Sequence, residues 1–74
     1  MNIIFFGHLT ELAGNSLVLD DVSDTDELVK VLHGLYPVLE NTKYIIAVNK
    51  KMISGNSILD QDSIIALLPP FSGG

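Results

Sequence analysis

A single amphipathic helix pattern, set among short segments typical of β-strands, is the strongest constraint on how this chain folds. The apolar stripe of the helix comprises Leu28, Val31, Leu32 and Leu35, at helical spacing. Asp24 is the expected N-terminal cap, with Glu27 completing a capping box, and Ser23 is an alternative cap. Gly34 and Pro37 mark the expected end. Because a helix of about three turns is stable only when packed, it must lie against a sheet.

Short segments rich in β-branched and aromatic residues predict that sheet. They are residues 2–6, 16–19, 44–48, 52–53 and 63–68. The first is expected to be buried on most of both faces and to form a hairpin with the second, through a loop carrying His8, Glu11 and Leu12. The apolar run 44–48 is expected to be a central strand. This order of elements predicts an α+β fold, a mixed sheet with one helix across a face.

Chain length and charge narrow the class of protein further. The 74 residues suffice for one small domain, residues 1–74. There is no cysteine, which excludes thiol catalysis, thiolate metal sites and disulfides, and which fits a reducing compartment. The net charge of −5, without arginine, argues against nucleic acid and anionic membranes as partners. With no signal-peptide pattern and no apolar run near the roughly 18 residues that span a bilayer, a cytoplasmic location is expected.

Residues able to do chemistry are few. His8 and His33 are the only histidines and are not at a ligand spacing, so no metal site is expected. The acidic residues at 20–21 and at 60 and 62 lack the ligand pattern of a calcium loop and are interpreted as turn carboxylates. No serine lies in a nucleophile elbow, and no glycine-rich phosphate loop is present. The sequence therefore predicts no enzyme activity for the chain on its own and no bound cofactor.

The C-terminal segment carries the functional information. It reads Pro69, Pro70, Phe71, Ser72, Gly73 and Gly74. A diproline holds the chain extended, and glycines without side chains can thread a narrow channel and present a bare carboxylate inside another protein. A terminal glycine also leaves the acyl carbon unhindered. These are the requirements of a carrier whose carboxylate is activated and attacked in a partner. A frayed end without function is the alternative that the residues alone leave open.

The chain resembles the ubiquitin-like β-grasp family and, within it, the small subunits of molybdopterin synthase, which are sulfur carriers. The matching segments are Ile4-Phe5-Phe6-Gly7 with Leu9, Glu11, Leu12 and Gly14, then Ala47-Val48-Asn49, Leu59 with Asp62, and Ala66-Leu67-Leu68-Pro69-Pro70-Phe71-Ser72-Gly73-Gly74. The resemblance covers essentially the whole chain. Its most discriminating part is the diproline before the glycines, which thiamine carriers and ubiquitin-like modifiers usually lack.

The resemblance implies a β-grasp domain with residues 69–74 as a flexible, extended tail. It also implies that an E1-like enzyme uses ATP to adenylate the carboxylate of Gly74, and that a sulfur donor protein then leaves a thiocarboxylate. The charged carrier docks on the large, catalytic subunit in a heterotetramer. There it passes sulfur to cyclic pyranopterin monophosphate, which forms the molybdopterin dithiolene in molybdenum cofactor biosynthesis.

Site residues follow from the same resemblance, position by position. Gly74 is the acyl residue. Tail threading is assigned to Gly73, Ser72, Pro69 and Pro70, and partner binding to Phe6, Met52, Leu68 and Phe71, the last as the anchor of the tail's base. For Phe6 and Leu68 the alternative is an ordinary place in the core.

Three departures from the family pattern bear on these assignments. The first loop has His8 and Thr10 where a basic residue is common, and Leu67 and Leu68 replace an aromatic pair before the diproline. Gln61 stands where the family has glycine, which predicts a left-handed backbone there at some cost. None of these departures touches the acyl-transfer end.

Two other functions share the activation chemistry and stay open from the sequence. One is a sulfur carrier for thiamine thiazole synthesis. The other is a protein modifier whose Gly74 forms isopeptide bonds with lysines of target proteins. A plain interaction domain with an idle tail is the remaining alternative. The fate of the acyl group distinguishes them, because a thiocarboxylate marks a carrier and a branched lysine conjugate marks a modifier.

Overall fold

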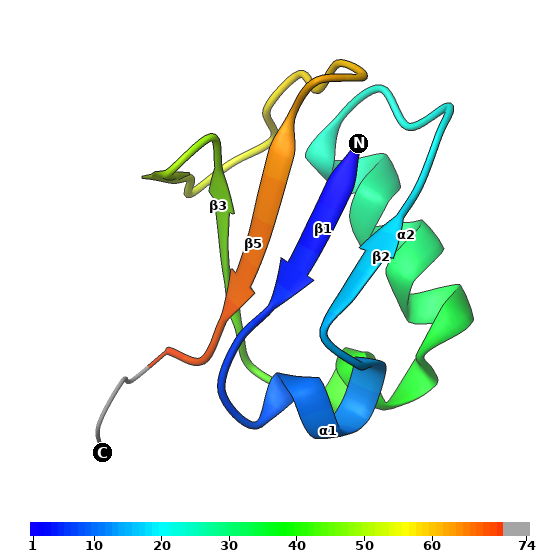
Figure 1. Ribbon diagram of the computed structural model, residues 1–74, viewed down its shortest axis with the longest axis vertical. Helices are drawn as coiled ribbons and strands as arrows, with labels where there is room; N and C mark the ends of the chain where they lie inside the picture. The colour runs from blue at the N-terminus through cyan, green and yellow to red at the C-terminus, as the bar shows by residue number, and fades with distance from the viewer. Residues whose placement is uncertain (71–74) are drawn as a thin grey trace.

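A mixed five-stranded sheet with a helix across one face forms the body of the molecule (Figure 1). The computed structural model describes residues 1–70. The elements are β1 (Asn2–Phe5), α1 (Leu9–Ala13), β2 (Ser16–Val18), α2 (Thr25–Leu35), the 3-10 helix η1 (Pro37–Asn41), β3 (Ile45–Val48), β4 (Lys51–Met52) and β5 (Ile64–Leu68). The strand order is β2-β1-β5-β3-β4, with only the β1–β5 pair parallel. The predicted α+β architecture is confirmed.

The core lies between α2 and the inner face of the sheet. Its fully buried side chains are Ile3, Leu9, Leu28, Leu32, Leu39, Ile65 and Leu67. Burial alternates along β1 and β5, because α2 covers only one face of the sheet. The expectation that residues 2–6 are buried on most of both faces was therefore wrong. Residues 45–48 form β3, which pairs with a strand on each side and is thus the interior strand that was predicted, while β5 inserts between β1 and β3 and takes the middle position.

A short helix, α1, replaces the loop expected between the first two strands. The side chain of Leu9 is completely buried at its start and covers one end of the core. The hydroxyl of Thr10 donates to the carbonyl oxygen of Gly7 at 2.8 Å, which holds the first turn. His8 and Glu11 remain exposed. Burial of one leucine and local hydrogen bonds thus make a helix from a segment without a helical pattern of its own.

The N-terminus of α2 carries the predicted cap, while the second bond of the capping box is shifted by one residue. Oδ1 of Asp24 accepts from the amide of Glu27 at 2.8 Å, so Asp24 is the cap. The carboxylate of Glu27 accepts from the amide of Ser23 at 2.9 Å rather than from that of Asp24. At the other end Gly34 lies inside the helix, and Leu35 is 52% exposed, so the buried stripe stops one turn earlier than predicted.

The turns before β4 and before β5 account for the remaining differences between the predicted and the observed structure. Asn49 and Lys50 both have positive φ and form the tight turn into β4, which spans Lys51–Met52 rather than 52–53. Gln61 is not among the residues with positive φ, so the predicted left-handed conformation there was wrong. Oδ1 of Asp60 accepts from the amide of Asp62 at 2.8 Å, a local turn that confirms the interpretation of this acidic pair.

Candidate docking face and carrier tail

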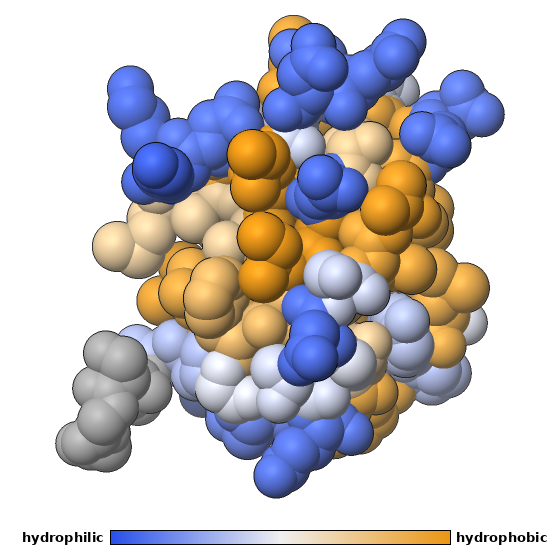
Figure 2. Space-filling model, viewed as in Figure 1, coloured by the Kyte–Doolittle hydropathy of each residue, from blue (hydrophilic) through white to orange (hydrophobic). Residues whose placement is uncertain are grey.

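The face of the sheet opposite α2 is open and largely apolar (Figure 2). The pairing of the strands shows which residues lie on this face, because side chains at paired positions point to the same side of the sheet. Ala66 of β5 lies between Ile4 of β1 and Ala47 of β3, and Leu68 pairs with Ile45. A sheet face of this kind without a covering layer exposes apolar area that a partner can bury.

A hollow of about 1010 Å³, here called the sheet hollow, opens on this face beside the start of the tail. It is lined by Phe6, Gly7, His8, Ile45, Ala47, Lys50, Met52, Ala66, Leu68, Pro69 and Pro70. Ala47 and Ala66 are register partners. Their small side chains lie between larger ones on the neighbouring strands, and the hollow follows from this contrast in size.

The three docking residues assigned within the described chain all line the sheet hollow. The side chain of Phe6 is 43% exposed and that of Met52 is 73% exposed, whereas Leu68 is half-buried. Phe6 directly follows β1, Met52 pairs opposite Ala47, and Leu68 ends β5. None of the three belongs to the core, so the alternative of ordinary core residues does not hold. Their role in partner binding stays a prediction.

The charge around the sheet hollow differs from that of the whole chain. The net charge is −5, yet among the described residues that line the hollow there is one lysine, Lys50, and no carboxylate. Acidic side chains that would repel an acidic partner are thus kept away from this surface. The hollow therefore suits a partner with an apolar surface flanked by negative charge.

Pro69 and Pro70 leave the end of β5 directly at the sheet hollow, with Pro69 half-buried and Pro70 exposed. The start of the predicted tail is thereby placed beside the predicted docking residues. The assignments to Phe71, Ser72, Gly73 and Gly74 lie outside the described residues and stay predictions. The same holds for the division of residues 1–74 into a domain and a tail.

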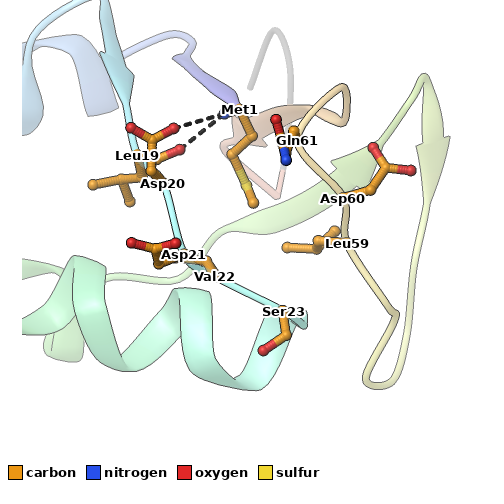
Figure 3. A pocket seen from close by; sticks show the side chains of 9 residues that line it. All are labelled: Met1, Leu19, Asp20, Asp21, Val22, Ser23, Leu59, Asp60 and Gln61. Atoms are coloured by element: carbon orange, nitrogen blue, oxygen red, sulfur yellow. Dashed lines mark hydrogen bonds and ion pairs between the residues drawn. The ribbon is translucent and has the colours of Figure 1, made fainter.

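A second, more polar hollow of about 640 Å³ lies at the opposite end of β1 (Figure 3). The amino group of Met1 donates to the carbonyl oxygen of Leu19 at 2.8 Å and lies 4.0 Å from the carboxylate of Asp20. Asp21 and Asp60 also line it. Within residues 1–70 no three histidine or carboxylate side chains gather as a metal site would require. None of the helices in this part of the chain has the length and apolarity to cross a membrane.

Comparison with known proteins assigns the family. A sequence model of the ThiS family matches residues 3–74. The chain belongs to the ThiS family. It is also similar to a chain in the complex of subunits 1 and 2 of molybdopterin-converting factor from Helicobacter pylori, with 28% identity and a TM-score of 0.75, over 99% of this chain and 96% of that one.

SAMP1 from Haloferax volcanii shares the fold, with 22% identity and a TM-score of 0.75, over 99% of this ThiS-family chain and 97% of SAMP1. These matches confirm the ubiquitin-like β-grasp fold. Together with the family, they confirm the predicted resemblance to ubiquitin-like sulfur carriers.

Three features of the site were not identified from the sequence. Ala47 and Ala66 line the sheet hollow, Lys50 also lines it, and Gly7 lies next to Pro69. Paired small residues inside two apolar strands are a visible signal, but only the strand register shows that they meet. The position of Lys50 follows from the tight turn before β4, whose type the sequence left open.

Proposed function

We propose that this ThiS-family protein is the sulfur-carrying small subunit of a molybdopterin synthase. The observation that carries the proposal is its similarity, over 99% of its length, to a chain of the two-subunit molybdopterin-converting factor complex. The sheet hollow supports it, since an open apolar face beside the carrier tail offers a second subunit a place to bind. In this role the chain is not a catalyst itself.

The proposed chemistry takes place at Gly74. Its carboxylate attacks the α-phosphorus of ATP in an E1-like enzyme, which releases pyrophosphate and leaves an acyl adenylate. A sulfur donor protein then delivers a hydrosulfide equivalent to the acyl carbon, so that a C–S bond forms and the C–O bond to AMP breaks. The product is a thiocarboxylate. Because the sulfur is bound to the end of the chain, the carrier needs no cysteine, and the sequence contains none.

The docked carrier then presents this sulfur to cyclic pyranopterin monophosphate in the large subunit. In each of two transfers, from two charged carriers, the thiocarboxylate sulfur forms a C–S bond to the substrate's side chain as a C–O bond there breaks. Water then attacks the acyl carbon of Gly74 and breaks its C–S bond, which leaves the sulfur on the substrate and returns the carrier to the carboxylate form. In this proposal Phe6, Met52 and Leu68 bury their exposed apolar area against the large subunit. The stiff diproline at positions 69 and 70 would give the tail a fixed starting direction for entry into the partner's active site.

The experiment that tests the proposal is an intact-mass measurement of the chain purified from its own cells, with fragmentation of its C-terminal peptide. Replacement of one oxygen by sulfur at Gly74, together with co-purification of a large synthase subunit, is the expected result. A thiazole-forming enzyme as the partner would instead indicate the thiamine pathway. Branched peptides that join Gly74 to lysines of many proteins would make the chain a modifier and overturn the proposal.

A further inference from the structure

Gly7 and Pro69 meet where β1 and β5 end side by side. The two strands are parallel, with Phe5 opposite Leu67, so two residues further along Gly7 falls opposite Pro69. The amide of Phe6 donates to the carbonyl oxygen of Leu67 at 3.0 Å, the last bond on this side of the ladder. Pro69 has no amide hydrogen to continue it. Contact between the two residues therefore depends on packing rather than on hydrogen bonding.

This packing leaves no room for a side chain at position 7. A Cβ added to Gly7 would lie 2.7 Å from Cγ and 3.3 Å from Cδ of Pro69, closer than non-bonded carbon atoms approach. The backbone at Gly7 has a φ of +58°, which also favours glycine. Its carbonyl oxygen accepts from both the amide and the hydroxyl of Thr10, at 3.2 and 2.8 Å, so the corner is held in place. The ring of Pro69 thus packs against the backbone of Gly7, which has no side chain and is held in place by Thr10.

We propose that Gly7 is a positioning residue for sulfur transfer: it seats the ring of Pro69 and so sets the direction in which the carrier tail leaves the sheet. The inference rests on the proposed function, because direction matters only if Gly74 must reach an active site. Displacement of reacting atoms by about 1 Å lowers rates by up to about a hundredfold, so a side chain at position 7 has a large effect at the end of the tail. Gly7 and Pro69 both line the sheet hollow, so their contact holds the start of the tail at a fixed position relative to the docking residues.

The test is a double-mutant cycle on carriers prepared chemically as the Gly74 thiocarboxylate, and its readout is the fraction that gives up its sulfur to the purified large subunit and its substrate within a fixed short time, measured by intact mass. Gly7→Ala should lower this fraction at least about tenfold when Pro69 is present. In the Pro69→Ala background, where Cγ and Cδ are gone, Gly7→Ala should lower it by no more than about twofold. An equal loss in both backgrounds, or no loss in either, would overturn the inference.

Two further variants separate the contact from backbone strain. Gly14→Ala is the matched control, because Gly14 has a φ of +85° but no atom within 4 Å of an added Cβ. It should keep the fraction within about twofold of the wild type. Gly7→Asn tolerates positive φ yet carries a Cβ, and should behave like Gly7→Ala. Wild-type behaviour of Gly7→Asn would attribute the effect to strain alone and overturn the inference. Circular dichroism checks that each variant folds.

A measurement on the free chain keeps this inference distinct from the proposed function. Nuclear Overhauser contacts between the α protons of Gly7 and the ring protons of Pro69 are expected in the wild type and need no sulfur chemistry. The absence of these contacts would show that Pro69 does not pack on Gly7 and would overturn the inference. A wild-type chain that shows these contacts but never carries sulfur would contradict the proposed function instead, and would remove the role of Gly7 in transfer while leaving the seat itself established.

Discussion

The hydroxyl oxygen of Tyr44 lies 2.8 Å from Nε2 of His33, and this pair joins α2 to the residue before β3. The two rings meet edge to face, with centroids 6.1 Å apart and planes at 85°. Both side chains are half-buried. Burial raises the pKa of Tyr44 above its ordinary value of 10.0, because the phenolate loses hydration in this position.

The raised pKa of Tyr44 predicts a loss of stability at alkaline pH. Its ionised form is less favourable in the folded chain than in the unfolded chain, so above pH 10.0 the folded state binds more protons. The free energy of unfolding should therefore be independent of this group below pH 10.0 and fall as pH rises through and beyond it. Urea denaturation between pH 8 and pH 11 measures this, with buffers of equal ionic strength at about 0.1 M.

Matched tyrosine variants identify the group responsible. Tyr44→Phe cannot ionise and should lose the part of the alkaline decline that belongs to this residue. Tyr36→Phe is the control, because it retains Tyr44 and should show the same alkaline decline as the wild type. The ring of Tyr36 packs edge-on against Phe5 and does not contact His33 in this way. An alkaline decline that is the same in Tyr44→Phe as in the wild type would contradict the prediction.

Asn56 connects the loop before β5 to the first turn of α2, and its removal should destabilise the fold. Its Oδ1 accepts from the amide of Asp26 at 2.8 Å and from the hydroxyl of Thr25 at 3.0 Å. Asn56→Ala leaves these donors without their partner and should lower the free energy of unfolding by about 1–2 kcal/mol. The control, Asn41→Ala, removes an exposed side chain with no hydrogen bond inside the described chain and should have an effect below about 0.5 kcal/mol. Equal effects in urea denaturation would refute the role of Asn56.

The sequence predicted those parts of the fold that depend on local patterns. The helix, its cap at Asp24 and the pairing of the first two strands follow from spacing and residue type, and they were found. The sequence could not show which face of β1 is covered, because Ile3, Ile4 and Phe5 are all apolar and only the position of α2 distinguishes them. It also missed α1, since one buried leucine and two contacts of Thr10 form it.

For the candidate site, resemblance identified residues but not their arrangement. Phe6, Met52 and Leu68 lie in three separate segments and meet because β5 inserts between β1 and β3. The sheet hollow arises from pairing across strands, which no local pattern contains. The contact between Gly7 and Pro69 likewise depends on the parallel register of β1 and β5.

The docking role of Phe6 predicts a strong effect of a buried charge. Phe6→Asp would place a carboxylate against the apolar surface of the large subunit and should raise the Kd by about 30-fold or more. The control is Ile58→Asp, because Ile58 is 89% exposed and lies outside the sheet hollow. It should leave the Kd within about threefold. Titration calorimetry with the purified large subunit measures both, and unchanged binding by a folded Phe6→Asp chain would mean that the docking face lies elsewhere.

Removal of Gly74 should abolish sulfur transfer by removing the proposed acyl position. The shortened chain would end in Gly73, one residue or about 3.5 Å short of the reacting atoms in the partner. Dithiolene formation in a reconstituted assay should therefore fall by at least about a hundredfold, without a change in the urea midpoint. The control, Glu40→Ala, changes an exposed residue of η1 outside the sheet hollow and should retain activity within about threefold. Full transfer by the shortened chain would contradict the mechanism.

The turn between β3 and β4 should become more stable when Lys50 is replaced by glycine. Lys50 has a φ of +72°, a conformation that costs a non-glycine residue about 1–2 kcal/mol, whereas glycine adopts it freely but loses more entropy on folding. Lys50→Gly should therefore raise the free energy of unfolding by about 0.5–1 kcal/mol. Lys51→Gly, one residue later in β4, should lower it by a similar amount, since glycine weakens a strand. Urea denaturation of the pair measures the opposite signs, and a loss of stability in Lys50→Gly would show that the positive φ carries no cost there.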